Sequence, residues 1–248
     1  ALYFLTLFLI LGVALYPGLK KMYPQVDPLN IVNNVLFYWI LADLVFRFFF
    51  QKLPVMLAKP LLTLPIKTSK IVNYVLGKSV TSFFNILPLF AIIPFGLTLI
   101  IEAYPIISVI TWMLSLILVT LIINFLNFII ESYSSETELS FLPIILFAGG
   151  LFALNHFGII SFAKLIGWGF EHIYNTPVLI VVLALILTAL YIVNARILRH
   201  KLFLDSSLKT KVKEVQASNL EWTRNFGDIA PFMQLDLKLI WRNKRSKS

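Results

Sequence analysis

The stretch PIISVITWMLSLILVTLIINFLNFII, residues 105–130, decides the fold of this chain. It contains no charged side chain over its whole length. A helix needs about 20 apolar residues to cross roughly 30 Å of hydrocarbon. A membrane β-strand would instead alternate apolar and polar residues over about 10 positions. The stretch therefore predicts a transmembrane helix and an all-α membrane protein.

Similar apolar runs lie on both sides of this stretch, and the composition agrees with them. Of the 248 residues, 59% are hydrophobic and only 13% are charged, which is outside the usual range of a soluble domain. Pro88, Pro94 and Gly96 predict a kink in the third run. The six candidate spans lie near residues 1–16, 29–50, 81–103, 105–130, 139–163 and 176–197.

These runs predict a six-span bundle over residues 1–197, followed by a cytoplasmic linker and an interfacial helix over residues 198–248. The sequence begins apolar at Ala1 without the basic leader of a signal peptide, and it stops in the basic cluster RNKRSKS. We therefore expect both ends to continue in a longer polypeptide. The absence of cysteine excludes disulfides and thiolate metal sites.

The basic residues predict how the spans are oriented. Short loops rich in Lys and Arg tend to remain cytoplasmic. If the six spans alternate in direction, all of the 21 basic residues except Lys20, Lys21 and Lys164 fall on one side. This side contains segment 51–80 and the region after the sixth span, so we expect a multi-pass protein of the inner (cytoplasmic) membrane with this side in the cytoplasm. Topology then accounts for the net charge of +9, and no nucleic-acid partner is expected.

Several polar residues are predicted at membrane depth. Asp43 and Arg47 are four residues apart, a spacing that favours an ion pair on one helix face. Such a pair with Arg47 extended toward the cytoplasm is favoured over a role in gating or in a substrate path. Asn124, Asn127 and Glu131 form one stripe of the fourth span, where amides more often join helices than contact a substrate.

The sequence contains no group of residues that predicts catalysis. His156 is the one histidine inside a predicted span and has no evident metal-binding or nucleophilic partner, so we expect it to pack between helices. The tripeptide GKS at Gly77–Ser79 lacks the earlier glycine of a phosphate-binding loop, since Val72 occupies that position. We therefore expect neither enzymatic activity nor a cofactor bound by this chain.

The segment KPLLTLPIKTSKIVNYVLGKS, residues 59–79, is too polar to span a membrane and too apolar to remain free in water. Its second part predicts a helix capped by Thr68 or Ser69. This helix would lie at the cytoplasmic interface, either as a lipid anchor or against an acidic partner. Its predicted apolar face consists of Ile71, Val72, Val75 and Leu76, and its lysines are Lys67, Lys70 and Lys78.

This segment resembles the cytoplasmic segment of ABC-2-type transporter permeases, and the six-span layout is similar as well. The matching positions are a leucine pair, a Pro-Ile dipeptide, a serine, an aliphatic residue and a Gly-Lys dipeptide before the third span. The resemblance implies docking on a separate ATP-hydrolysing subunit, which would bind the ATP. The matching residues are Leu61, Leu62, Pro65, Ile66, Ser69, Ile71, Gly77 and Lys78. Together with Lys67 and Lys70 they form the set of residues that we assign to coupling.

The C-terminal stretch 231–245 predicts an amphipathic helix that begins at Pro231. The chain is most similar to an uncharacterised bacterial branch of permease-like proteins with two such halves in one polypeptide. In these permeases an elbow helix leads into a six-span bundle, so the resemblance implies a second half or a homodimer. A membrane-surface helix is the alternative. The elbow residues are Gln234, Lys238, Trp241, Arg242 and Arg245.

Two other functions remain open at this stage. The chain could be a non-transporting membrane scaffold or assembly factor, which would form a stable complex without an ATPase. An intramembrane hydrolase ranks third, and its turnover would depend on His156.

The orientation predicts how single cysteines react with an impermeant thiol reagent in intact cells. A cysteine at Ser69 or Ser207 should be protected, because both positions are assigned to the cytoplasm, and a cysteine at Asn175 should react. The cysteine-free background supplies the control. Labelling at Ser69 from outside would reverse the assigned orientation.

Overall fold

A computed structural model of the chain describes residues 2–51, 61, 65–134 and 141–210. Within these ranges every regular element is a helix, so the predicted all-α class is confirmed. Contacts divide the chain into residues 1–206 and 207–248. The predicted elbow residues lie outside the described ranges.

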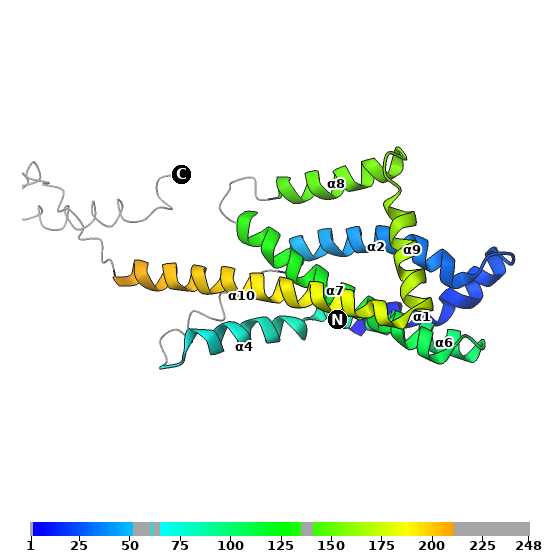
Figure 1. Cartoon of the computed structure of the whole chain (residues 1–248), viewed down its shortest axis with the longest axis horizontal. Coiled ribbons are helices and arrows are strands. Elements are labelled where there is room, and N and C mark those ends of the chain that lie inside the picture. Colours follow the sequence, from blue (N-terminus) through cyan, green and yellow to red (C-terminus); the bar gives the residue numbers. More distant parts are fainter. Residues whose placement is uncertain (1, 52–60, 62–64, 135–140, 211–248) are drawn as a thin grey trace, which may run out of the picture. The chain divides into compact units, whose positions relative to one another are not determined.

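The helices of the first unit follow one main direction, with one exception. Figure 1 shows α2, α7, α8 and α10 running along the long axis of the view, whereas α9 runs across them. The elements are α1 (Leu2–Met22), α2 (Pro28–Phe50), α4 (Thr68–Val80), α5 (Phe83–Ile86), α6 (Leu89–Ile101), α7 (Ile106–Ser134), α8 (Leu142–His156), α9 (Phe162–Asn175), the 3-10 helix η1 (Pro177–Leu179) and α10 (Ile180–Thr210).

Among the described residues, five segments are long and apolar enough to cross a membrane, which makes this a multi-pass membrane protein. The fifth predicted span, 139–163, is different. Its helix α8 has 15 residues, and therefore a length of about 22 Å. The chain turns after α8 at Gly158, whose φ is +71°, and continues into α9. The candidate spans are Leu2–Met22, Pro28–Phe50, Phe83–Ile101, Ile106–Ser132 and Pro177–His200.

Some boundaries also differ from the prediction. Helix α1 continues to Met22 and carries Pro17 inside it, so the first helix is longer than the predicted run 1–16. The predicted kink in the third span is a break between α5 and α6, with Pro88 at the start of α6. Helix α10 extends to Thr210, beyond the predicted end of the bundle at residue 197.

Helix α1 packs closely on α6. A Cβ atom at Gly12 would lie 2.5 Å from the carbonyl oxygen of Ala91, so the absence of a side chain allows the two backbones to approach. Deeper in this part of the bundle, Phe95 of α6 and Trp112 of α7 are buried with their ring centroids 5.6 Å apart. The core here therefore joins α1, α2, α6 and α7.

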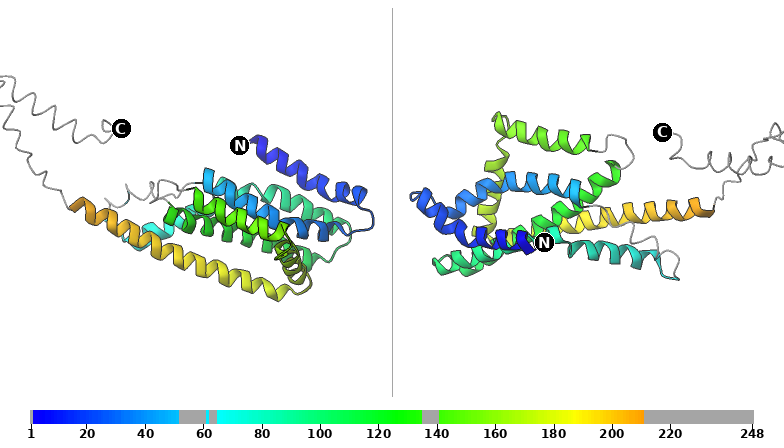
Figure 2. Two further views of the ribbon diagram at one scale, coloured as in Figure 1. Left: turned by 90° about the horizontal axis from the view of Figure 1, so that it is seen from above. Right: turned by 180° about the vertical axis from the view of Figure 1, so that it is seen from behind.

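Helix α4 packs against protein along its whole apolar face. Val72, Val75 and Leu76 are at most 1% exposed and belong to one cluster with residues of α7 and α10. Figures 1 and 2 show α4 beside α10. The helix begins at Thr68, with Lys67 at its N-cap and no side-chain capping bond, so the predicted cap by Thr68 or Ser69 is wrong. The partners in the cluster are Phe125, Phe128, Ala195 and Leu198.

This packing predicts unequal effects of two substitutions on α4. Leu76→Ala should lower the free energy of unfolding by about 3 kcal/mol, because it opens a cavity at a site that is 1% exposed. Tyr74→Ala is the matched control, since Tyr74 is 54% exposed on the same helix. Denaturant titration of the purified chain in mixed micelles measures both. Equal effects would show that α4 does not pack on α7 and α10.

Candidate functional site

A buried guanidinium lies where α4 meets the membrane spans. The Arg47 side chain on α2 is 0% exposed. Its Nε donates to Asp43 Oδ2 at 2.8 Å, and its Nη1 donates to Gln51 Oε1 at 3.1 Å and Asn85 Oδ1 at 2.7 Å. Its Nη2 donates to the Phe84 carbonyl oxygen at 2.8 Å. The cation is thus held by acceptors from α2 and α5.

The predicted Asp43–Arg47 pair on one helix face is confirmed, but the outward extension of Arg47 is wrong. An arginine that extended to water would leave Asn85 Oδ1 and the Phe84 carbonyl oxygen without this donor. Burial of a charge is tolerated when its hydrogen-bonding capacity is satisfied, as it is here by one carboxylate and three neutral oxygens.

The polar cluster continues from Arg47 to α4 and α7. Gln51 Nε2 donates to Asn124 Oδ1, and Asn124 Nδ2 donates to Ser79 Oγ at 3.2 Å. Asn85 Nδ2 donates to the carbonyl oxygens of Ser79 and Val80, both at 3.0 Å. The last turn of α4 is therefore hydrogen-bonded to both α5 and α7. We call this group the junction network, which consists of Asp43, Arg47, Gln51, Ser79, Asn85, Asn124 and Asn127.

The structure brings part of the predicted polar set together. Asn124 and Asn127 of α7 are 0% exposed, and Asn127 Nδ2 donates to the Gln51 carbonyl oxygen at 3.4 Å. Glu131 lies one turn further along α7 and is half-buried. Gln51 and Asn85 were missed by the sequence analysis. Both are amides near the ends of predicted spans, but only the burial of Arg47, which the sequence did not predict, identifies them as its acceptors.

The residues assigned to coupling lie on α4 and in the segment before it, and they differ in exposure. Ile66, Lys67 and Lys70 are exposed, whereas Ile71 is buried in the cluster with α7 and α10 and is not available for docking. Leu61 is half-buried against that cluster, and Leu62 lies outside the described residues. The other exposed members of the assigned set are Pro65, Ser69, Gly77 and Lys78.

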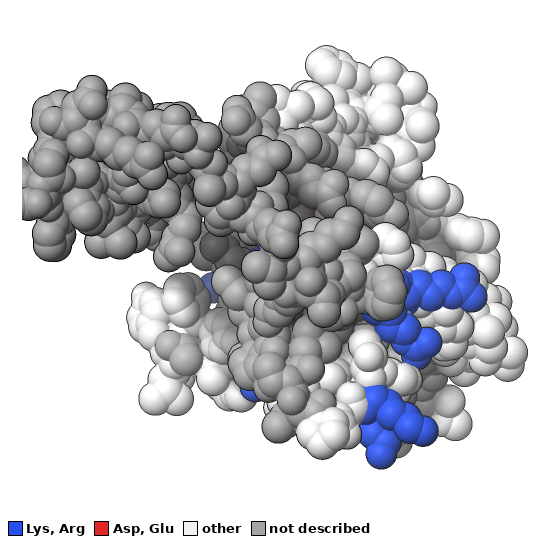
Figure 3. Space-filling view, turned by 90° about the vertical axis from the view of Figure 1, so that its left-hand side faces the viewer, with Lys and Arg blue, Asp and Glu red and all other residues white. Residues whose placement is uncertain are grey.

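The exposed side of α4 is basic and continues onto α10. Arg199 Nη2 donates to Ser69 Oγ at 3.2 Å, which brings a further cation beside Lys67 and Lys70. Among the described residues in view, Figure 3 shows blue Lys and Arg side chains and no red acidic side chain. We call Lys67, Lys70, Lys78, Arg196 and Arg199 the basic face, since all five are exposed.

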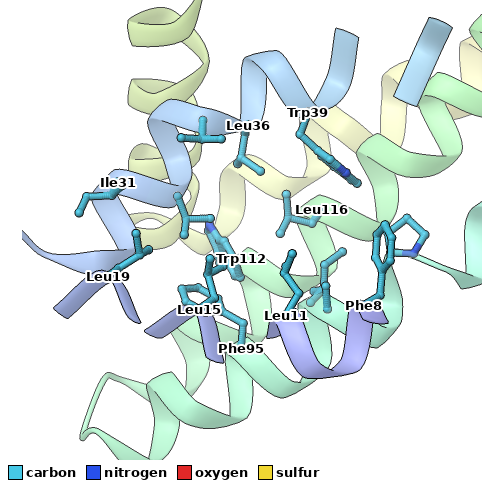
Figure 4. A pocket seen from close by; sticks show the side chains of 15 residues that line it. Phe8, Leu11, Leu15, Leu19, Ile31, Leu36, Trp39, Phe95, Trp112 and Leu116 are labelled. Carbon is cyan, nitrogen blue, oxygen red and sulfur yellow. The ribbon is translucent and has the colours of Figure 1, made fainter. Parts of the chain in front are cut away.

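An apolar cavity of about 370 Å³ lies between the spans α1, α2, α6 and α7. Figure 4 shows Phe8, Leu11 and Leu15 of α1 on one side of it. Trp39 of α2 and Trp112 of α7 also line it. Because its lining is apolar, the cavity suits hydrocarbon and offers no group for chemistry on a polar substrate.

His156 lies at the C-terminal end of α8 and is exposed. Its ring stacks on Phe152 with centroids 5.9 Å apart and contacts Phe157 edge-on at 5.6 Å. Among residues 2–51, 65–134 and 141–210, no three His, Asp or Glu side chains lie close enough to hold a metal ion. The rings of Phe152 and Phe157 belong to α8 or to the residue directly after it, and His156 is exposed, so the predicted packing of His156 between helices is not observed.

The junction network predicts a large stability difference between two asparagines. Asn85→Ala removes an acceptor of Arg47 and the donor to Ser79 and Val80, so it should lower the unfolding free energy by about 3 kcal/mol. Asn73→Ala is the control, since Asn73 makes one exposed bond, from Tyr191. Asn73→Ala should lower the unfolding free energy by no more than about 1 kcal/mol. Equal losses in the same denaturant titration would show that the network does not stabilise this junction.

No curated protein and no solved structure matches the chain. One family does match, over residues 1–248, and its description is "Family of unknown function (DUF5687)". The chain, a multi-pass membrane protein with a buried polar junction beneath a basic surface helix, belongs to the DUF5687 family.

Proposed function

We propose that this chain is the membrane-spanning permease subunit, or one half of it, of an ABC-2-type exporter. In this proposal α4 is the coupling helix that docks on a separate ATPase. The observation that carries the proposal is the position of α4 between the second and third spans, with its apolar face covered by α7 and α10 and its last turn held by the junction network.

This packing favours a docking helix over a lipid anchor. A lipid anchor needs an apolar face that is free to enter the headgroup region. On α4 that face is already buried, with Ile71 at 2% exposure and Val72 at 0%. The exposed side instead carries Tyr74 and lysines of the basic face, and the exposed Ile66 lies just before the helix. These residues suit an acidic protein surface with an aromatic and an aliphatic contact.

The junction network gives the helix a stiff connection to the spans. A nucleotide-dependent movement of an ATPase affects a substrate path only if it displaces the membrane helices. Ser79 and Val80 of α4 are bonded to Asn85, which is bonded to Arg47 of α2, while Asn124 links Ser79 to α7. A displacement of α4 would thus act on two spans through short buried hydrogen bonds.

The complete exporter would include further components. ATP would bind to the partner ATPase, and this chain would bind no cofactor and catalyse no reaction. A second permease half or a second copy would complete the substrate path. The protein would reside in the inner (cytoplasmic) membrane with α4 on the cytoplasmic side and in contact with lipid around its spans.

The proposal predicts capture of an ATPase from native membranes with the tagged chain. The double variant Pro65→Gly/Ile66→Asp should insert normally but lose the ATPase, because it removes a rigid apolar contact at the exposed start of the segment. The charge reversal Lys67→Glu/Lys70→Glu should weaken capture. Mass spectrometry identifies the captured protein, and nucleotide hydrolysis by the eluate measures its activity.

Lys21→Glu is the matched control, because it reverses a lysine at the other end of the spans, in the last turn of α1. It should retain the ATPase at matched expression. Retention by all three variants would show that α4 is not the docking element. If the wild-type chain captures another stable partner and no ATPase, the protein is a membrane scaffold.

A further inference from the structure

A second, polar pocket lies between α2 and α9, and neither the coupling role nor the apolar cavity accounts for it. Its volume is about 220 Å³, below the usual range of about 300–1,000 Å³ for sites of drug-sized ligands, so it suits a small molecule. The pocket is at the opposite end of α2 from the junction network. It is lined by Asn30, Asn33, Asn34, Lys164, Gly167, Trp168 and Glu171.

Asn33 supplies a buried donor without a partner. The residue is 2% exposed, and its Oδ1 accepts a hydrogen bond from Trp112 Nε1 at 2.8 Å. Its Nδ2 is buried and makes no hydrogen bond within the described part of the chain. A buried donor without an acceptor is costly, so a ligand oxygen that reached this amide would find a favourable partner.

Two opposite charges lie at the rim of the same pocket. Lys164 and Glu171 are seven residues apart on α9 and therefore on one face of the helix. Both are exposed, and the ion pairs between described residues include neither of them. Trp168 lies between them in sequence and is 57% exposed. The rim thus offers an ammonium group, a carboxylate and an indole ring.

Gly167 allows α9 to approach α2 at this point. A Cβ atom on Gly167 would lie 2.6 Å from Asn34 Oδ1, closer than a real Cβ contact. The glycine therefore allows the asparagine side chain to lie directly against the backbone of α9. This close crossing brings the amides of α2 and the charges of α9 to one pocket.

We propose that this pocket binds a small zwitterion that carries one oxyanion and one ammonium group. The oxyanion accepts from Asn33 Nδ2 and pairs with Lys164, while the ammonium group pairs with Glu171 beside the Trp168 ring. A ligand with charges of both signs matches the rim better than a simple anion or cation, since either of these would leave one charge of the rim without a partner.

The same chemistry can come from two sources, a free zwitterion or the headgroup of a zwitterionic lipid. The inference does not depend on the proposed ATPase coupling. Asn33 and Gln51 are separated along α2 by about 27 Å, so the pocket and the junction network are distinct sites.

Binding of phosphoethanolamine to the full chain in lipid nanodiscs of phosphatidylglycerol tests the proposal. Isothermal titration should show binding at least tenfold tighter than that of inorganic phosphate or ethanolamine alone. Lys164→Gln and Glu171→Gln should each weaken it about tenfold, the usual effect of losing a hydrogen bond to a charged group. Lys21→Gln, which alters a lysine at the same end of the spans but outside the pocket, should leave the affinity unchanged.

Nanodiscs that contain phosphatidylethanolamine distinguish the two sources. If the lipid headgroup is the ligand, these discs should weaken binding of free phosphoethanolamine at least tenfold by competition. Glu171→Gln should then remove the difference in phosphoethanolamine affinity between the two kinds of nanodisc. Unchanged affinity in both lipids identifies a free zwitterion. Absence of binding to the wild-type chain, or equal affinity for phosphate alone, would overturn the proposal. Circular dichroism confirms that the variants retain their helices.

Discussion

The buried Arg47 guanidinium is the constraint on which the rest of this structure depends. A cation with 0% exposed side-chain surface is tolerable only where its donors are matched by acceptors, because the loss of hydration is otherwise very costly. Those acceptors include Asp43 on α2, Gln51 directly after α2, and the Asn85 side chain and Phe84 carbonyl at α5. The guanidinium therefore fixes where the chain re-enters the bundle after α4.

The junction network and the polar pocket lie at opposite ends of α2, and an apolar cavity lies along the spans. Trp112 belongs to both surroundings, because it lines the cavity and donates to Asn33, which lines the polar pocket. The same indole therefore lines the apolar cavity and also binds the amide of Asn33. In an exporter, this contact would join the membrane-facing cavity to the pocket at the far end from α4.

Run length and periodicity were sufficient for the all-α class, for five of the six predicted spans, and for the residues that form the apolar face of α4. They failed at α8 and α9, because an apolar run does not show whether a helix turns at Gly158 and continues across the bundle. They also predicted that the Arg47 side chain extends outward, whereas it is buried. Its burial depends on Asn85, which is distant in sequence, and no local pattern reports such a partner. The polar pocket likewise depends on the crossing of α2 and α9, which no sequence period encodes.

Hydrogen–deuterium exchange of the wild-type chain in nanodiscs measures whether α4 is a rigid part of the bundle. We expect the amides of Ile71–Val80 to be protected to a degree similar to those of α7 around Phe125 and Phe128, because the two helices open together. Exchange of Ile71–Val80 at the rate of a separate surface helix, with α7 still protected, would contradict it. In that case α4 could not transmit a displacement to the spans.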